Sequence, residues 1–113
     1  MPPKKNPLGL NALQLKTLTL LQELARSPQH AEPQADGSIR VSGLPQPHGD
    51  HFHVGSAVVL AGDATGLVNP SAWAALERKG LIKSEFPIAA VLTHSGIAYD
   101  TGLAGAILHR ATH

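Results

Sequence analysis

Between residues 11 and 25 the apolar positions recur every three or four residues, which is the period of an amphipathic α-helix. The positions that share one broad stripe, with Leu18 at its edge, are Leu13, Thr17, Leu20, Leu21 and Leu24. The positions on the opposite side are Lys16, Thr19, Glu23 and Arg26. Asn11 can cap this helix, Gln14 completes a capping box three residues later, and Pro28 ends it. We therefore expect a helix over residues 11–25 whose leucine face packs in the core.

Two later segments have the alternation of apolar and polar residues that is typical of β-strands. Residues 38–44 alternate around Ile39 and Val41, and strand character resumes over residues 52–60. The intervening residues contain two prolines, which predicts a rigid connection. We therefore expect a β-hairpin over residues 38–60, preceded by a polar loop over residues 27–37.

Residues 69–81 carry helix signals at both ends. Asn69 can serve as the N-cap, and Pro70 suits the first helical position because its missing N–H has no partner there. Gly80 stands where a left-handed residue ends a helix, and Leu81 follows it, as a Schellman motif requires. These local signals agree, and they predict a short helix with a defined stop.

Short elements are expected on both sides of this helix. Residues 61–68 predict a degenerate helical turn, which Asp63 caps and Gly66 ends. Residues 81–85 and 88–92 have the composition of two short strands that flank a tight turn.

The C-terminal stretch is expected to be helical. Thr93 can cap a helix, and the apolar residues that follow over residues 96–111 are Ile97, Leu103, Ile107 and Leu108. Small residues at three- and four-residue spacing would allow another helix to approach closely. The partner is either the first helix or the same helix of a second subunit, and we expect a homodimer.

The order of helix, glycine stop, two short strands and further helix resembles MarR-type winged helix-turn-helix regulators. The residues that carry the resemblance are Leu76, Lys79, Gly80, Leu81, Ile82, Leu92, Thr93 and Gly96. The resemblance covers about residues 63–99 and implies an α+β fold. That fold is a small winged helix-turn-helix domain over residues 10–113, with the β-hairpin inserted after its first helix and residues 1–9 as a flexible arm. In that family the wing is longer and carries arginine at its tip, whereas the turn here is Glu85, Phe86, Pro87 and Ile88.

The amino-acid composition limits the classes of function that this chain can have. The chain has 113 residues, of which 42% are hydrophobic and 15% charged, so it supports one folded domain and not a disordered segment. Its formal net charge of +1 is low for a dedicated nucleic-acid-binding domain. The absence of cysteine excludes disulfides, thiolate metal sites and a cysteine nucleophile. No apolar run suits a signal peptide or a membrane span, so we expect a cytoplasmic bacterial protein with no membrane partner.

The resemblance makes residues 69–81 the helix that contacts double-stranded DNA. The candidate contact residues are Ser71, Arg78, Lys79 and Lys83, with Lys4 and Lys5 on the mobile arm. The residues expected on the exposed face of the helix are Ser71, Ala72, Ala74, Ala75 and Arg78. Alanine offers no hydrogen bond to a base edge, so we expect little sequence discrimination.

Histidine is unusually frequent, with seven residues, and three of them lie in the segment PHGDHFHVG. If Phe52 lies in a strand, His51 and His53 point to the same face. This is a ligand spacing for zinc or another divalent transition metal, and His48 and Asp50 could complete the site. His94 is a further candidate ligand, from the wing side. The alternative is a solvent-facing histidine strand that binds no metal.

No catalytic constellation emerges. His94, Ser95 and Asp100 lack the surroundings of a nucleophile elbow, so we expect a non-enzymatic protein. Three functions stay open. The first is a DNA-binding transcriptional regulator. The second is a protein-interaction or dimerisation module that uses the alanine-rich helix and the turn at Phe86 and Pro87. The third is a metal- or pH-responsive binding protein that uses the histidine segment.

Overall fold

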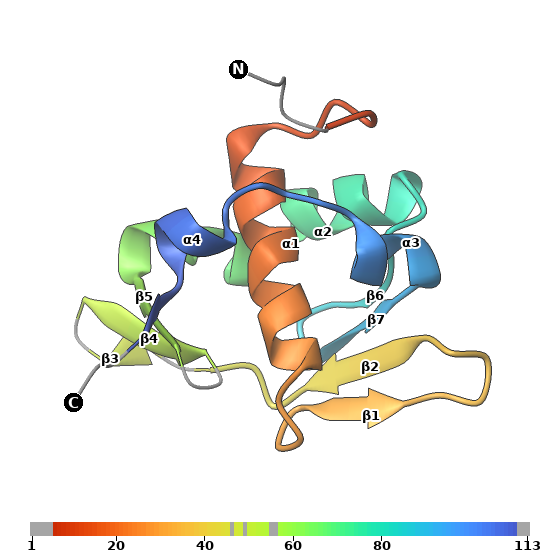
Figure 1. Ribbon diagram of the computed structural model, residues 1–113, viewed down its shortest axis with the longest axis horizontal. Helices are drawn as coiled ribbons and strands as arrows, with labels where there is room; N and C mark the ends of the chain where they lie inside the picture. Colours follow the sequence, from red (N-terminus) through yellow and green to blue (C-terminus); the bar gives the residue numbers. More distant parts are fainter. Residues whose placement is uncertain (1–5, 46, 49, 55–56, 111–113) are drawn as a thin grey trace.

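The computed structural model describes residues 6–45, 47–48, 50–54 and 57–110, and it shows an α+β fold with two antiparallel sheets. Figure 1 shows α1 (Ala12–Ala25) at the centre of the molecule, and this helix contacts strands of both sheets. The first sheet contains, in spatial order, β1 (Ala31–Pro33), β2 (Ile39–Ser42), β7 (Ala89–Leu92) and β6 (Ile82–Glu85). The second contains β3 (Pro47–His48), β4 (His51–Val54), β5 (Ala57–Leu60) and β8 (His109–Arg110).

The predicted start of α1 is confirmed. The Asn11 side chain accepts a hydrogen bond from the Gln14 N–H at 2.8 Å, and the Gln14 side chain accepts one from the Asn11 N–H at 3.0 Å. The prediction that only one face is buried is wrong. Leu18 is fully buried, and Thr19 and Glu23, expected on the solvent side, are 2% and 7% exposed. The central position of α1 explains this, because neighbouring elements cover most of its circumference.

The hairpin predicted over residues 38–60 is wrong. Strand β2 pairs with β1 on one side and with β7 on the other, so that Val41 faces Ala31 and Ala90 in the register. Strand β1 lies within residues 27–37, which were predicted as a loop. The alternation along a strand reveals its buried face but not its partner, and the partner β7 comes much later in the chain.

Residues 52–60, which were predicted as one long strand, instead belong to two paired strands of the second sheet. The chain reverses between Val54 and Ala57, which face each other in the register of β4 and β5. Phe52, Val54 and Val59 are buried and belong to the core. Strand β8, from the C-terminal end, adds to β5 and completes the sheet.

Residues 61–68 do not form the single capped turn that was predicted. They form two 3₁₀ turns, η1 (Ala61–Asp63) and η2 (Thr65–Val68). Asp63 caps neither turn, and its carboxylate lies 2.9 Å from the Lys16 ammonium on α1. Gly66 lies within η2 so close to α1 that a Cβ atom would collide with the Thr17 side chain.

Both predicted ends of α2 (Pro70–Arg78) are confirmed. The Asn69 side chain accepts a hydrogen bond from the Ser71 N–H at 2.9 Å. At the other end Gly80 has a left-handed φ of 77°, and the Leu81 N–H donates to the Leu76 carbonyl at 3.1 Å. This is the 6→1 bond of a Schellman motif.

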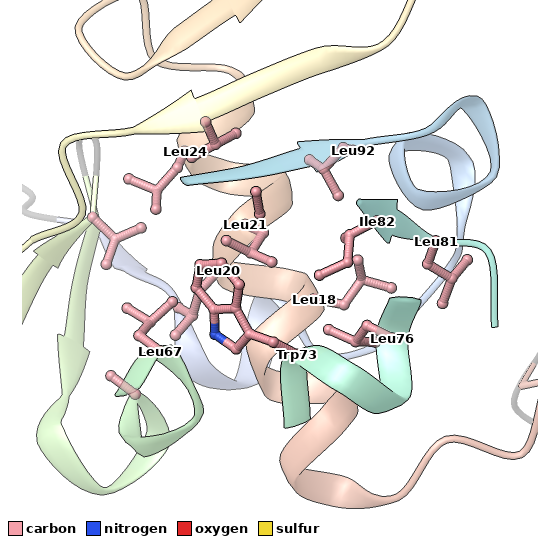
Figure 2. Packing of buried hydrophobic residues seen from close by; sticks show 14 of the residues in the cluster. Leu18, Leu20, Leu21, Leu24, Leu67, Trp73, Leu76, Leu81, Ile82 and Leu92 are labelled. Carbon is pink, nitrogen blue, oxygen red and sulfur yellow. The ribbon is translucent and has the colours of Figure 1, made fainter. Parts of the chain in front are cut away.

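The core joins α1 to α2 and to the first sheet, as Figure 2 shows. The residues of α1 and α2 that meet there are Leu18, Leu20, Leu21, Leu24, Trp73 and Leu76. Ile82 and Leu92 cover them from β6 and β7. Trp73 is fully buried, and its indole N–H donates to the Gly66 carbonyl at 3.0 Å. A buried indole therefore ties α2 to η2 with its one polar atom satisfied.

The C-terminal helix predicted over residues 96–111 is wrong. Its start is confirmed, because the Thr93 hydroxyl accepts from the Gly96 N–H at 3.1 Å and caps α3 (His94–Ala98). Only a second short helix, α4 (Ala104–Ile107), follows before β8. The Gln22 amide of α1 donates to the Gly96 and Tyr99 carbonyls at 2.8 and 2.7 Å, so these carbonyls are satisfied without a continuing helix.

Part of the predicted arm, residues 6–9, is bound to the domain. The Tyr99 hydroxyl donates to the Asn6 side chain at 2.5 Å and accepts from the Leu8 N–H at 3.2 Å. Lys4 and Lys5 lie outside the described residues. None of the helices in the described ranges is long and apolar enough to cross a membrane.

Candidate functional site

The exposed face of α2 is narrower than predicted. Ala72 and Ala75, which were expected on it, are 2% and 5% exposed and belong to the buried side. This is a correction with a simple cause, because α2 packs against both α1 and η2 and covers a wide arc of its surface. The residues left on the outside are Pro70, Ser71, Glu77, Arg78 and the half-buried Ala74.

Three cations follow closely in the chain where α2 ends and β6 begins, and Lys83 lies on the same face of the first sheet as Arg40. Arg78 is the last residue of α2, Lys79 is its C-cap, and Lys83 is the second residue of β6. All three side chains are exposed. Within the described ranges, no carboxylate lies within ion-pair distance of any of them. Arg78 and Lys79 also sit at the negative end of the helix dipole, which favours cations there.

The neighbouring carboxylates are engaged elsewhere. Glu77 accepts a hydrogen bond from the Ser84 N–H at 3.0 Å, which joins the outer side of α2 to the edge strand β6. Glu85 accepts two hydrogen bonds from the Arg40 guanidinium, at 3.1 Å from Nε and 3.0 Å from Nη2. Glu85 is therefore paired with a cation from another strand, whereas Glu77 keeps its negative charge beside Arg78 and Lys79.

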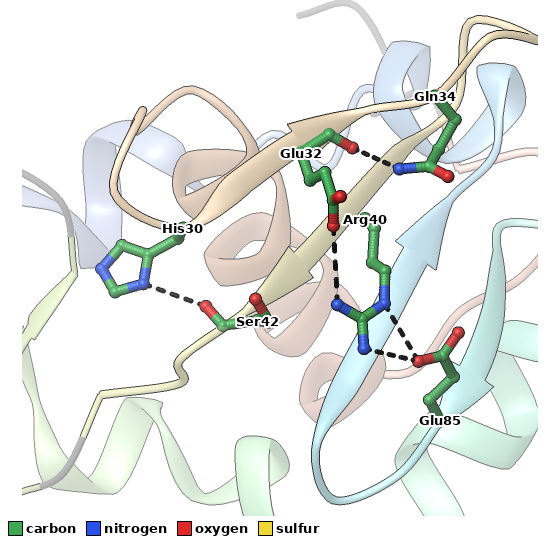
Figure 3. Close-up of polar contacts among 6 residues, drawn as sticks. All are labelled: His30, Glu32, Gln34, Arg40, Ser42 and Glu85. Atoms are coloured by element: carbon green, nitrogen blue, oxygen red, sulfur yellow. Dashed lines mark hydrogen bonds and ion pairs between the residues drawn. The ribbon is translucent and has the colours of Figure 1, made fainter.

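Arg40 contacts one of these carboxylates, and this contact was not predicted from the sequence. Figure 3 shows it on β2, between Glu32 of β1 at 3.6 Å and Glu85 of β6. These residues lie on the face of the first sheet opposite to Val41. Only the strand order, with β2 next to β7 and β7 next to β6, brings this arginine to Glu85.

The turn between β6 and β7 is partly used by the core. Its ends are joined by a hydrogen bond from the Ile88 N–H to the Glu85 carbonyl at 2.9 Å. The Phe86 ring packs edge-on against Trp73, with 5.0 Å between the ring centroids. Of the apolar turn that was predicted to bind a protein, Pro87 and Ile88 remain exposed, the latter to 68%.

The histidine pair of β4 lies as the alternation predicted. His51 and His53 share one face, their ring centroids are 5.0 Å apart, and Phe52 and Val54 are buried on the other face. The Asp50 carboxylate lies 3.4 Å from Nδ1 of His51. His48 of β3 is paired with His51 in the register, and its side chain lies outside what the structure describes. The searched part of the chain contains no group of three or more histidine, aspartate or glutamate side chains placed to hold one metal ion.

His94 has a separate role. Its Nε2 lies 2.8 Å from the Asp36 carbonyl, in the turn between β1 and β2, so the structure does not bring it to the β4 pair. The same turn holds the Asp36 carboxylate. Hydrogen bonds from the Ser38 hydroxyl and then the Ser38 backbone N–H lower the pKa of Asp36, and the positive charge of Lys83 lowers it further. Lys83 thus interacts with a solvent-exposed carboxylate from beyond ion-pair distance.

Comparisons with known proteins give no family for this chain: no family model, no curated protein and no solved structure matches it.

Proposed function

We propose that this chain is a non-enzymatic, cytoplasmic winged-helix protein that binds double-stranded DNA through the end of α2 and the start of β6. In this interpretation η1 and η2 stand in place of the first helix of a helix-turn-helix, α2 is its second helix, and the β6–β7 hairpin is the wing. The pairing of β2 with β7 supports this interpretation, because it joins the wing to a strand that follows α1.

The observation that carries the proposal is the set of three exposed cations, Arg78, Lys79 and Lys83, next to carboxylates that are already bonded. Phosphate contacts supply most of the affinity of a protein for duplex DNA, and each needs a donor. Lys79 and Lys83 suit the phosphate backbone. Ser71 and Arg78 lie seven residues apart on the outer face of α2, where they can approach base edges.

Sequence discrimination by this surface is expected to be low. Between Ser71 and Arg78 the outer face of α2 offers Ala74, which has no polar atom in its side chain, and Glu77, which is held by Ser84. Direct readout depends on polar side chains that reach base edges. Binding should therefore be dominated by the backbone and should depend strongly on salt.

Fluorescence anisotropy with a labelled mixed-sequence duplex, at low salt and pH 6, tests the proposal. Lys79→Ala and Lys83→Ala should each weaken binding and reduce the slope of log affinity against log salt by about 1. The matched control is Arg26→Ala, which removes one exposed cation from the C-cap of α1. An absence of binding, or an equal loss with Arg26→Ala, would contradict the proposal.

A protein-interaction module is the second candidate, and the exposed Ile88 at the turn favours it. In that case Ile88→Ser should abolish association with a partner or a second copy and leave duplex binding unchanged. The C-terminal helix that was expected to form a homodimer interface is absent from the described residues, where short helices take its place. Homodimerisation remains a proposal, and light scattering that shows a monomer at high protein concentration would end it.

A further inference from the structure

The first sheet ends in β1 on one side and in β6 on the other, as the strand order β1-β2-β7-β6 shows. Figure 1 shows β1 on the outside of this sheet. An edge strand presents backbone N–H groups with which a strand of another chain can pair, and such pairing is a common route to aggregation. The N–H groups that β1 and β6 direct outward therefore decide whether the sheet can accept a further strand.

The outward N–H groups of β1 are used or missing. The Gln34 N–H donates to the Ser38 carbonyl at 2.8 Å, and bonded pairs alternate along an antiparallel ladder, so Ala31 and Pro33 direct their backbone groups away from β2. The Ala31 N–H donates to the Ser27 carbonyl at 2.9 Å. Proline has no N–H. Of the residues described for β1, none offers a donor to an added strand.

The outward N–H groups of β6 are also out of reach. The Thr93 N–H donates to the Leu81 carbonyl at 3.1 Å, so by the same alternation Ile82 and Ser84 direct their backbone groups away from β7. Ile82 is 1% exposed, so another chain cannot approach its N–H. The Ser84 N–H donates to the Glu77 carboxylate at 3.0 Å. Glu77 therefore occupies the donor of β6 that another chain could otherwise reach.

The two edge strands carry opposite charges at matching positions. The register runs from Glu32 of β1 through Arg40 and Val91 to Lys83 of β6, so these side chains share one face of the sheet, and Glu32 and Lys83 are exposed. Opposite charges on neighbouring strands stabilise a pair, and like charges destabilise it. Pairing between two β1 strands or two β6 strands brings like charges together. Pairing of β1 with β6 of another copy brings Glu32 to Lys83.

The strand directions favour the same arrangement. Every neighbouring pair in the sheet is antiparallel, so β1 and β6 run in opposite directions. A second copy in the same orientation could therefore continue the antiparallel sheet, with its β1 beside β6 of the first copy. A contact between two different surfaces of one chain leaves both surfaces available at the ends of the assembly, so growth does not stop at a dimer.

We propose that the Glu77–Ser84 hydrogen bond and Pro33 prevent copies of this chain from adding head to tail through the edges of the first sheet. The occupant of an unblocked edge is a second copy of the chain, with β1 of one copy against β6 of the next. Glu77 acts here through the backbone of β6, so this role does not depend on the proposed binding of duplex DNA.

A double variant removes the block at both edges. Glu77→Ala frees the Ser84 N–H, and Pro33→Val gives β1 an outward N–H. Sedimentation velocity between about 10 µM and about 1 mM should show that this variant associates beyond a dimer. Adding Glu32→Lys, which places lysine beside lysine, should suppress the association.

Two matched controls separate the freed edge from other effects. Glu77→Gln with Pro33→Val keeps a side-chain acceptor for Ser84 and should sediment as the unaltered chain does. Asn69→Ala with Pro33→Val weakens the start of α2 and leaves Glu77 in place, so it tests whether lost stability alone causes association. Trp73 fluorescence in urea checks that each variant is folded.

Hydrogen exchange of the Ser84 amide tests the contact in the unaltered chain as well. We predict slow exchange there at every concentration, faster exchange in the dilute Glu77→Ala with Pro33→Val variant, and renewed protection as that variant assembles. Fast exchange in the unaltered chain would overturn the block at β6. Association of the double variant that is no greater than in the Asn69→Ala control, that stops at a dimer, or that persists with Glu32→Lys would overturn head-to-tail addition.

Discussion

The carboxylate of Glu77, on α2, accepts a hydrogen bond at 3.0 Å from the backbone N–H of Ser84, on the edge strand β6. This contact satisfies a donor that an edge strand would otherwise present to solvent or to another chain. It also places the one anion of the outer face of α2 against the protein itself, beside three exposed cations. The contact therefore stabilises the α2–β6 corner and holds one negative charge at that corner.

Glu77→Gln should strengthen duplex binding. Glutamine keeps a side-chain acceptor for Ser84 and removes one negative charge next to Arg78 and Lys79, so the corner gains one unit of positive charge. We expect several-fold tighter binding at low salt, with the gain disappearing as salt screens the field. Anisotropy measures it. Asp50→Asn makes the same charge change on the second sheet and should have little effect; an equal gain there would indicate a general charge effect and not a local one.

Gly66→Ala should destabilise the fold by about 2 kcal/mol or more, because the added methyl group would have to displace Thr17 on α1. Gly62 is the matched control, since it is exposed in the neighbouring 3₁₀ turn and has open space where a Cβ would stand. Gly62→Ala should change the stability by less than about 0.5 kcal/mol. Urea unfolding followed by the fluorescence of the single tryptophan, Trp73, measures both. Equal effects of the two changes would contradict the close approach of η2 to α1.

Asn69→Ala should cost about 1 kcal/mol, because it removes the side-chain acceptor of the first turn of α2. Asn69→Ser keeps a capping oxygen and should retain most of that stability. Urea unfolding again provides the measurement. A serine variant as unstable as the alanine variant would show that Asn69 acts through something other than its cap.

Acid should remove a stabilising contribution of Asp36. The Ser38 hydroxyl and N–H hold the pKa of Asp36 below its ordinary value in the folded protein. A carboxyl whose folded pKa is depressed stabilises the native state at a pH above its unfolded pKa, about 3.9, and this contribution is lost as the pH falls through the folded pKa. Ser38→Ala should therefore raise the Asp36 pKa, which an NMR titration measures, and should make the stability less dependent on pH below about 4. An unchanged Asp36 titration would refute the Ser38 contact.

The sequence predicted those parts of the fold whose causes lie within a few residues. The capping box of Asn11 and Gln14 and the cap at Asn69 each depend on groups three or fewer positions apart. The stop at Gly80 depends on one left-handed glycine and on a hydrogen bond between Leu81 and Leu76, five positions apart. Interactions between residues this close in the chain can be predicted from a short stretch of sequence, and the structure confirms them.

The features that were not predicted from the sequence depend on contacts between residues far apart in the chain. Thr19 was expected on the solvent side of α1, yet its hydroxyl donates to that of Thr101 at 2.6 Å in the buried interior. Where the C-terminal helix was predicted to continue, the amide of Gln22, far earlier in the chain, donates hydrogen bonds to the carbonyls of Gly96 and Tyr99. At the candidate site, the positions of the cations could be predicted from the sequence. The hydrogen bonds between Arg40 and Glu85 could not, because they depend on the order of the strands in the sheet.

The proposed contact between duplex DNA and the corner of α2 and β6 can be located residue by residue. The measurement is amide chemical-shift mapping of the ¹⁵N-labelled chain during addition of a mixed-sequence duplex, at low salt and pH 6. We expect saturable shifts at Ser71, Arg78, Lys79 and Lys83 and their neighbours, with the resonances of β4 and β5 unmoved. A spectrum unchanged by the duplex, or shifts confined to the histidine strands or to the turn at Ile88, would contradict it.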